Sequence, residues 1–452
     1  MTGADNSASG SPRARPEARR NSGTPGGVPY PAPASASHPR PPPVPPATRM
    51  SALVAPPLAL YVHFPWCVRK CPYCDFNSYT LHGALAQEPY VARLGRDIAA
   101  QAPLVTGRAV TSVFFGGGTP SLFSPEAMGQ VLEAARRHLS VARDAEVTLE
   151  ANPGAIERGA FREYRAVGVT RVSLGAQSFD ERALRALGRI HSPADTRRAA
   201  AELHAAGLGN FNLDLMYGLP GQEVAGAARD VEEALALSPA HLSHYQLTLE
   251  RGTPFAARPP ALPDDDACAA MLDECRARLG AAGFGHYEVS AYARPGAQCR
   301  HNLNYWTFGD YLGVGAGAHG KLTLPAPGRI VRTTQPHEPR RYLAAADGAL
   351  AQREILAAEL PFEFMLNALR LTAGFEEATF VARTGLAWQV VDAAVRAALD
   401  AGLLSRTAGG YRPSPHGLRF LNDLLLRFLP ETPKNSGASA LSMATPEVPA
   451  TA

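Results

Sequence analysis

The chain has 452 residues, of which 46% are hydrophobic and 19% are charged, and its formal net charge is +3. A chain of this length predicts one large domain with a smaller companion, and the hydrophobic content supports a buried core. The near-neutral charge argues against a nucleic-acid-binding protein, and six cysteines in so long a chain argue against a disulfide-based scaffold. The apolar runs are too short for a transmembrane helix, which needs about 18 consecutive apolar residues.

The two ends of the chain differ in composition from the middle. Residues 1–54 are rich in Pro, Ser, Gly and Arg, and residues 431–452 are similarly poor in large apolar side chains. Such segments bury too little surface to offset the entropy lost on ordering, so we expect both to be disordered. No apolar stretch follows the arginine pair at 19–20, which argues against a signal peptide. The sequence leaves open whether Met1 or Met50 is the true start.

Between these ends, strand patterns alternate with segments of helical spacing, such as 126–139 and 195–208. Repeated strand–helix units imply parallel strands joined by right-handed crossovers. Six units are too few to close an eight-stranded barrel, so we predict an α/β domain at 55–325 with an open, partial (β/α)6 TIM-like barrel. The expected strands are 58–64, 110–115, 146–152, 171–177, 211–217 and 241–249.

The remaining part, residues 326–430, has a mainly helical pattern. Helices are expected at 360–371 and 387–404, followed by a hairpin-like RTAGGYRPS segment and a further helical stretch. This order resembles a winged-helix module. Its arginines are scattered rather than clustered on one face, so we expect a lid or a partner surface instead of a DNA-binding domain.

A polar group or a flexible loop stands at the end of each of the first five predicted strands. A cysteine loop follows the first strand and GGGTP (116–120) follows the second. Glu150 and Asn152 end the third strand, Gln177 ends the fourth, and Asp214 lies late in the fifth. In parallel α/β folds the reactive groups gather at the carboxyl ends of the strands. The sequence therefore predicts one site lined from one rim of the barrel.

The cysteine loop, C-x3-C-x2-C, contains Cys67, Cys71 and Cys74. A [4Fe–4S] cluster usually has four thiolate ligands, so three ligands would leave one iron open to an exogenous amine and carboxylate. The alternative is a zinc site completed by His63 or His82, although zinc sites usually pair two C-x2-C knuckles and the sequence has no second knuckle. Thiolate ligands require a reducing compartment, so we expect a cytoplasmic protein.

The cysteine loop after the first strand, together with GGGTP after the second, resembles the radical S-adenosylmethionine (radical SAM) superfamily, in which the open iron binds S-adenosylmethionine. The resemblance spans roughly 57 to 430. The longer string YVHFPWCVRKCPYCDFNSY narrows it to the branch of the oxygen-independent coproporphyrinogen III dehydrogenases and the HemW heme chaperones. The dehydrogenases typically carry a further cysteine two residues after the third, whereas Phe76 and HNLNYW (301–306) match the chaperone group.

The resemblance implies a role for each matching residue, with the three cysteines as ligands of the [4Fe–4S] cluster. Glycines let a backbone approach a ligand closely, and Arg189 is suited to pair with the cofactor carboxylate. Without the family resemblance, Tyr61 and Tyr73 would be interpreted as core residues, and Arg189 as a solvated charge on a helix. The matched S-adenosylmethionine contacts are Tyr61, Tyr73, Gly117, Gly118, Thr119, Glu150, Gln177, Arg189 and Asp214.

Two functions remain open. The first is a heme chaperone that binds heme and transfers it to acceptor proteins, membrane respiratory proteins among them, while carrying the cluster and exchangeable S-adenosylmethionine. The second is an oxygen-independent coproporphyrinogen III dehydrogenase using radical chemistry, an activity that Phe76 argues against. His301, Tyr305 and Trp306 are candidates for a heme ligand and an apolar wall. The alternative for these three is a structural lid, because the sequence has no C-x-x-C-H attachment motif.

Overall fold

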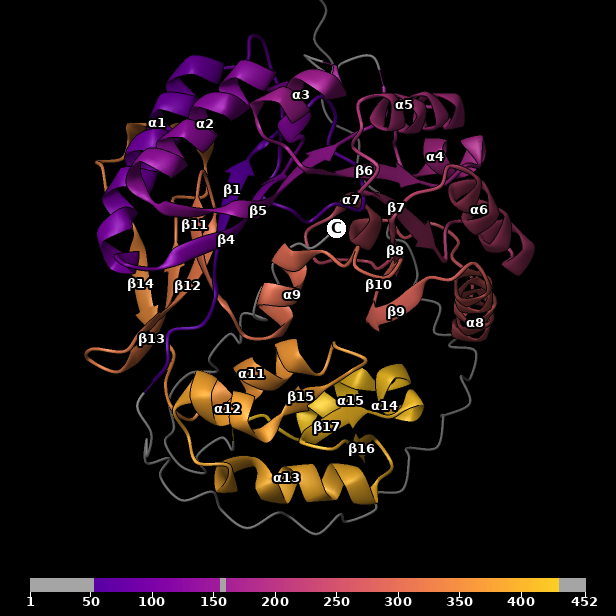
Figure 1. Ribbon diagram of the computed structural model, residues 1–452. Coiled ribbons are helices and arrows are strands. Elements are labelled where there is room, and N and C mark those ends of the chain that lie inside the picture. The colour runs from indigo at the N-terminus through magenta and orange to yellow at the C-terminus, as the bar shows by residue number, and fades with distance from the viewer. Residues whose placement is uncertain (1–52, 155–159, 431–452) are drawn as a thin grey trace, which may run out of the picture. The chain divides into compact units, whose positions relative to one another are not determined.

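The computed structural model in Figure 1 describes residues 53–154 and 160–430. The disorder expected for 1–54 and 431–452 therefore concerns residues outside the described ranges, apart from Leu53 and Val54. Leu53 is buried in a hydrophobic core formed mainly by the C-terminal part of the chain. Within the described ranges, no helix combines the length and the apolar character that crossing a membrane requires.

Six parallel strands form the centre of the main sheet and correspond to the six predicted strands. β1 pairs with β4, and β5, β6, β7 and β8 follow in chain order, each parallel to its neighbour. Every residue of β6 and β7 is buried, as expected for strands that are covered on both faces. The bounds are β1 Leu58–Phe64, β4 Ala109–Gly117, β5 Ser140–Ala151, β6 Arg171–Gln177, β7 Phe211–Tyr217 and β8 His241–Gln246.

The helices between these strands cover one face of the sheet (Figure 1). Two of them begin at serine caps followed by a proline in the first helical turn, a combination that fixes where a helix starts. Ser124 accepts a hydrogen bond from the amide of Ala127 (3.3 Å), and Ser192 forms a capping box with Asp195. The bounds are α1 Gln87–Gln101, α2 Pro125–His138, α3 Phe161–Val167, α4 Glu181–Ala186, α5 Pro193–Ala205 and α6 Val224–Ala236. Two further helices follow β8, α7 Pro254–Ala257 and α8 Asp265–Ala281.

The sheet continues beyond the predicted strands at both edges, in the order β14-β13-β12-β11-β1-β4-β5-β6-β7-β8-β10-β9. β14 and β9 stand at opposite ends of this order, so the sheet is open, as the prediction of a partial barrel requires. β11 and β12 were not predicted, because β11 and the start of β12 lie in the Gly-rich stretch 309–320. Gly313 lies so close to the carbonyl of His319 that a Cβ would collide with it. The added strands are β9 Gly285–Glu288, β10 Ala291–Ala293, β11 Asp310–Val314, β12 His319–Leu324, β13 Arg329–Thr334 and β14 Ala351–Glu354.

Several short elements complete the barrel region. β2 and β3 pair in parallel at the two ends of the cysteine loop. α9 packs against β1 and β4, and 3-10 helices occupy residues 102–105 and 120–122. The bounds are β2 Trp66–Cys67, β3 Tyr79–Thr80, α9 Arg300–Trp306 and α10 Pro339–Ala344.

The C-terminal part has its own hydrophobic core and a three-stranded sheet in the order β15-β17-β16. Aromatic rings fill this core: Trp388 stacks on Tyr411 at 5.4 Å, and Phe364 meets Phe375 edge-on at 5.3 Å. The predicted helical character of this region is confirmed. The bounds are α11 Leu360–Ala368, β15 Phe375–Glu376, α12 Glu377–Thr384, α13 Gln389–Asp400, β16 Leu404–Arg406, β17 Gly410–Pro413, α14 Pro415–Arg419 and α15 Leu421–Leu426.

Candidate functional site

A cavity of about 1280 Å³ lies at the carboxyl ends of the parallel strands. It brings together the three cysteines and eight of the nine residues predicted to contact S-adenosylmethionine. These residues come from loops and strand ends that are far apart in the sequence, which is the arrangement expected for a site at one rim. They are Cys67, Cys71, Tyr73, Cys74, Gly117, Gly118, Thr119, Glu150, Gln177, Arg189 and Asp214.

Hydrogen bonds from within the chain hold the cysteine loop in a fixed shape. Lys70 Nζ donates to the carbonyl oxygens of Phe76 (2.9 Å) and Ser78 (3.0 Å), and so ties the first half of the loop to the second. The amide of Cys74 donates to the carbonyl of Cys71 (3.2 Å), which forms a tight turn between two of the thiols. All three thiols are free of disulfides. The loop therefore offers three thiols to one cavity.

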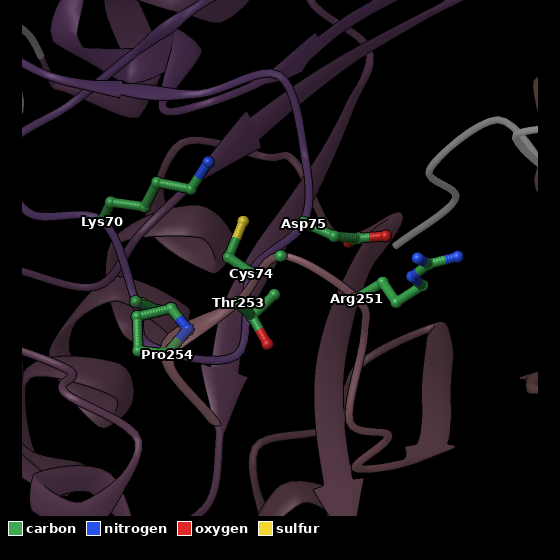
Figure 2. A pocket seen from close by; sticks show the side chains of 8 residues that line it. Lys70, Cys74, Asp75, Arg251, Thr253 and Pro254 are labelled. Carbon is green, nitrogen blue, oxygen red and sulfur yellow. The ribbon is translucent and has the colours of Figure 1, made fainter. Parts of the chain in front are cut away.

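A smaller pocket of about 250 Å³ adjoins Cys71 and Cys74. Figure 2 shows Cys74 between Lys70 and Asp75, with the segment after β8 passing close by. That segment contributes Arg251, Gly252, Thr253 and Pro254 to the lining. The loop is thus bounded on one side by residues that the cysteine motif alone does not reveal.

Burial keeps two of the thiols protonated when no metal is bound. It raises the pKa of Cys67 to about 11 and also raises the pKa of Cys74. Metal ligation removes such protons, so cluster binding to these thiols would release protons. The Arg189 guanidinium lies 3.8 Å from the sulfur of Cys71 and adds positive charge beside a developing thiolate.

His63, one of the two histidines considered as a fourth zinc ligand, is engaged by other residues. The hydroxyl of Tyr61 lies 2.9 Å from His63 Nδ1, and the carbonyl oxygen of Asn77 lies 2.9 Å from Nε2. Both ring nitrogens of His63 are therefore engaged. Across residues 53–154 and 160–430, no three His, Cys, Asp or Glu side chains converge where a single metal ion would sit.

The glycines of GGGTP are required by packing as well as by access to a ligand. Gly117 has a φ of +118°, and a Cβ at this position would lie 2.5 Å from Cε1 of His63. At Gly118 a Cβ would lie 2.6 Å from the carbonyl oxygen of Trp66. The amide of Thr119 donates to that same carbonyl (2.8 Å). The loop is thus locked against the strand that leads into the cysteines, which the sequence interpretation did not anticipate.

Two buried carboxyl groups, Glu150 on β5 and Asp214 on β7, face the cavity. Burial raises the pKa of Glu150 to about 8, and the nearby Asp214 contributes to that rise. Burial raises the pKa of Asp214 to about 6, opposed by hydrogen bonds that include Asn212 Nδ2 to Oδ1 at 2.6 Å. The amide of Gly117 donates to Glu150 Oε2 at 2.9 Å. A cationic ligand would therefore favour the charged forms of both groups.

Arg189 is held at the centre of a polar network. Its Nη2 donates to the carbonyl oxygen of Gly175 (2.7 Å) and to the side-chain oxygen of Asn152. The Asn152 Nδ2 in turn donates to Thr119 Oγ1 (2.9 Å). Asn152, which the strand-end rule placed at the rim with Glu150, directly follows β5 and lines the cavity, although no cofactor contact was predicted for it.

Gln177, at the end of β6, has a left-handed backbone with a φ of +67°. Such a conformation is uncommon for a residue with a side chain and often marks a functional position. The hydroxyl of Tyr245 donates to Gln177 Oε1 at 2.8 Å. The hydrogen bond and the backbone together fix the amide in the cavity wall.

Tyr61 is the one predicted cofactor residue that does not line the cavity. Its hydroxyl lies against His63, and burial raises its pKa well above the ordinary value. The His63 ring in turn lies where a side chain at Gly117 would stand. Tyr61 therefore acts on the glycine loop through His63.

The three heme candidates, His301, Tyr305 and Trp306, are buried in α9 outside the cavity lining. The ring of His301 contacts the hydroxyl of Ser112 (3.1 Å) through Nδ1 and that of Tyr305 (3.1 Å) through Nε2. It also stacks on Phe114 at 4.9 Å. The three residues pack in the interior where α9 meets β1 and β4, and iron ligation by His301 would require one of these contacts to break.

Comparisons with known proteins agree with this geometry. The Radical SAM superfamily model matches residues 61–234, and the HemN C-terminal domain model matches residues 355–420. The chain is 48% identical over 381 residues to "Heme chaperone HemW" of Escherichia coli (strain K12), covering 83% of this chain and 99% of that protein. The chain belongs to the HemW family of the radical SAM superfamily. The resemblance inferred from the cysteine loop, Phe76 and HNLNYW is confirmed.

Other relatives extend the HemW comparison. A mouse protein, "Radical S-adenosyl methionine domain-containing protein 1, mitochondrial", is 40% identical over 82% of this chain and 87% of its own length. The solved structure of coproporphyrinogen III oxidase (HemN) from Escherichia coli has a TM-score of 0.70, covering 83% of this chain and 90% of that one. At 22% identity this structure supports the fold alone, the partial barrel with a helical C-terminal region.

Proposed function

We propose that this protein binds heme and transfers it to acceptor proteins. The observation that carries the proposal is the 48% identity with a protein named heme chaperone, over nearly that protein's whole length. Phe76 supports the same conclusion from the residues. It lines the cavity where the dehydrogenase branch carries a further cysteine. Acceptors such as membrane respiratory proteins, and a cytoplasmic location, belong to the same proposal.

We further propose that Cys67, Cys71 and Cys74 hold a [4Fe–4S] cluster. The donor set fits, because three free thiols face one cavity on a loop pinned by Lys70. When bound, such a cluster supplies one iron with an open coordination position for the amino and carboxylate groups of S-adenosylmethionine. Arg189 places a fixed positive charge next to Cys71 and is suited to pair with a carboxylate there.

The remaining cavity residues provide complementary chemistry for S-adenosylmethionine. Glu150 and Asp214 would balance the positive sulfonium or accept hydrogen bonds from ribose hydroxyls. Thr119 and Gln177 supply neutral polar groups, each held by a neighbouring side chain. We expect S-adenosylmethionine to exchange, because side chains already held in place let it bind and leave without rearranging the cavity wall.

The second candidate function is the oxygen-independent dehydrogenation of coproporphyrinogen III. It is considered because a solved structure with a similar fold is a coproporphyrinogen III oxidase, and Phe76 argues against it. The two functions separate in one pair of measurements on anaerobically reconstituted protein. A heme titration followed at the Soret band should saturate at a fixed stoichiometry, and coproporphyrinogen III with S-adenosylmethionine and a reductant should give no product. Product formation without heme uptake would reverse the assignment.

A further inference from the structure

The cavity extends beyond the residues assigned to S-adenosylmethionine. Its far end lies between β8, α8 and the β9–β10 turn, where His244, Arg276 and His286 line it. The segment 418–423 from the C-terminal part lines the same cavity. Small-molecule sites usually occupy about 300–1000 Å³, and this cavity of about 1280 Å³ exceeds that range. A second ligand therefore has room beside the cofactor.

Arg276, on α8, offers an uncompensated positive charge at this end. Its Nε is buried without a hydrogen-bond partner, and the described residues give its guanidinium no ion pair. The neighbouring Tyr292 hydroxyl interacts with the guanidinium, but as a neutral group it supplies no counter-charge. Arg278, two residues later, is by contrast paired with both Glu232 and Glu274. Arg276 is half-buried in the cavity wall and has no counter-charge among the described residues, so it is placed for an anionic ligand.

Acidic residues share the cavity with Arg276, and Asp423 in the segment 418–423 is one of them. Asp265 and Asp266 also line the cavity. They precede Arg276 by ten or eleven residues, which corresponds to about 15 Å along a helix. An anion beside Arg276 is therefore well separated from them.

His244, on β8, is a buried histidine with an unsatisfied ring nitrogen. Its exposed fraction is 3%, and its Nδ1 is buried without a hydrogen-bond partner within the described part of the chain. The ring stacks on Tyr217 at 4.7 Å. On the same strand, both ring nitrogens of His241 are satisfied, by Asn212 (2.6 Å) and Tyr287 (2.8 Å). Buried polar groups are normally hydrogen-bonded, so the unmet Nδ1 shows that the ring has unused bonding capacity beside the cavity that it lines.

The protonation state of His244 suits a metal. Burial, reinforced by the charge of Arg276, lowers the pKa of His244 to about 3. The imidazole is thus neutral at physiological pH, which is the form that ligates iron. Apolar side chains that face the same cavity include Leu272, Leu418 and Phe420, and Phe420 is 44% exposed. A flat apolar ligand would cover them.

We propose that this end of the cavity is the heme site, with Arg276 paired to a propionate and His244 presenting its imidazole to the iron. The inference rests on the proposed heme-binding function. Heme combines carboxylates at one edge, a flat apolar macrocycle and an iron that accepts imidazole, and the site offers a partner to each. The cargo and S-adenosylmethionine then share one cavity, and the segment 418–423 forms part of its wall.

The propionate contact is tested with hemin and hemin dimethyl ester, titrated into the full-length reconstituted protein and into Arg276→Met. A charge-assisted contact of this kind is worth about tenfold or more in affinity. Arg276→Met should bind hemin about tenfold more weakly, and the ester should bind the unsubstituted protein with a similar loss. The variant should no longer distinguish the two ligands. Arg278→Met, the matched control on the same helix, should behave as the unsubstituted protein.

The iron contact is tested with His244→Phe, which retains a ring to stack on Tyr217. The Soret band should shift and the hemin affinity should fall, whereas the control His138→Phe, at the exposed end of α2, should leave both unchanged. An unshifted Soret band would overturn the assignment of His244.

Three further results are decisive. If the unsubstituted protein takes up no hemin, the proposed function itself is refuted. Uptake that is equal for Arg276→Met, or equal for hemin and its ester, would overturn only the site. Loss of labelled S-adenosylmethionine binding in Arg276→Met, with hemin binding retained, would assign Arg276 to the cofactor instead.

Discussion

Gly117→Ala should destabilise the protein through a collision with His63, independently of any ligand. The backbone of Gly117 has a φ of +118°, and a Cβ there would lie 2.5 Å from Cε1 and 2.7 Å from Nδ1 of the His63 ring. The ring has no free direction of retreat, because Tyr61 and Asn77 hold its two nitrogens at 2.9 Å each. Relief of the collision therefore breaks these hydrogen bonds or shifts the end of β4 away from β1.

The expected magnitude has two parts. A left-handed backbone costs a residue with a Cβ about 1–2 kcal/mol, and overpacking by one methyl group costs about 1–3 kcal/mol. The sum is about 2–5 kcal/mol, which corresponds to a fall in Tm of roughly 4–10 °C at about 2 °C per kcal/mol for a large domain. The effect should be visible in the protein without cluster or cofactor.

Gly107→Ala is the matched control, because Gly107 has a φ of +79° and a Cβ there would meet nothing within 4 Å. It should show the backbone term alone, a fall of roughly 2–4 °C. Thermal unfolding followed by circular dichroism compares the two variants under one condition. Equal shifts would refute the collision with His63. The comparison also matters for binding assays, since weaker cofactor binding by a Gly117 variant would not by itself place the ligand at the loop.

Three other predictions address the site. Cys71→Ala should lose most of the iron and sulfide bound on anaerobic reconstitution, whereas the buried Cys275→Ala should retain them, and elemental analysis would separate the two. Burial raises the pKa of Glu150 to about 8, so the folded state favours the protonated carboxyl, and the stability this group contributes is full below about 4.5 and lost as pH rises through 8. The Tm of the apo protein should therefore fall more between pH 5 and pH 9 than that of Glu150→Gln, and parallel curves would contradict this. Phe76→Cys should not gain the ability to convert coproporphyrinogen III in an anaerobic assay, because one cysteine does not rebuild a substrate pocket; product from this variant would show that position 76 alone blocks the reaction.

The sequence predicted the parallel centre of the sheet because each strand there carries a local signal. The strands 58–64, 171–177 and 211–217 have the predicted bounds in the structure. The strands at the two edges lack such a signal. β11 and β12 are interrupted by glycines, whose role is to let two backbones approach closely, as at Gly313. A prediction from side-chain alternation misses such strands, because their glycines carry no side chain that could show the alternation.

The candidate site could be predicted to the extent that it depends on strand ends. Glu150, Gln177 and Asp214 follow the rim rule, and the structure places them in one cavity with the cysteines. The contacts between the site residues are not predictable in this way, even where the rim rule also finds the partner. Asn152 links Arg189 to Thr119 across positions separated by more than thirty residues, and only the folded chain shows that the amide of Gly117 donates to Glu150.

Histidines show most clearly what residue type alone leaves undecided. The sequence directs attention to His301, which stands in a motif, whereas the structure shows both of its ring nitrogens in contact with hydroxyl groups. His244 belongs to no motif, yet it is buried with an unpartnered Nδ1 close to the charge of Arg276. A ligand is expected where bonding capacity is unused, since an unsatisfied buried polar group costs about 1–3 kcal/mol until a partner arrives. A buried side chain with an unused hydrogen-bonding group is therefore a better guide to the proposed heme site than a side chain that belongs to a sequence motif.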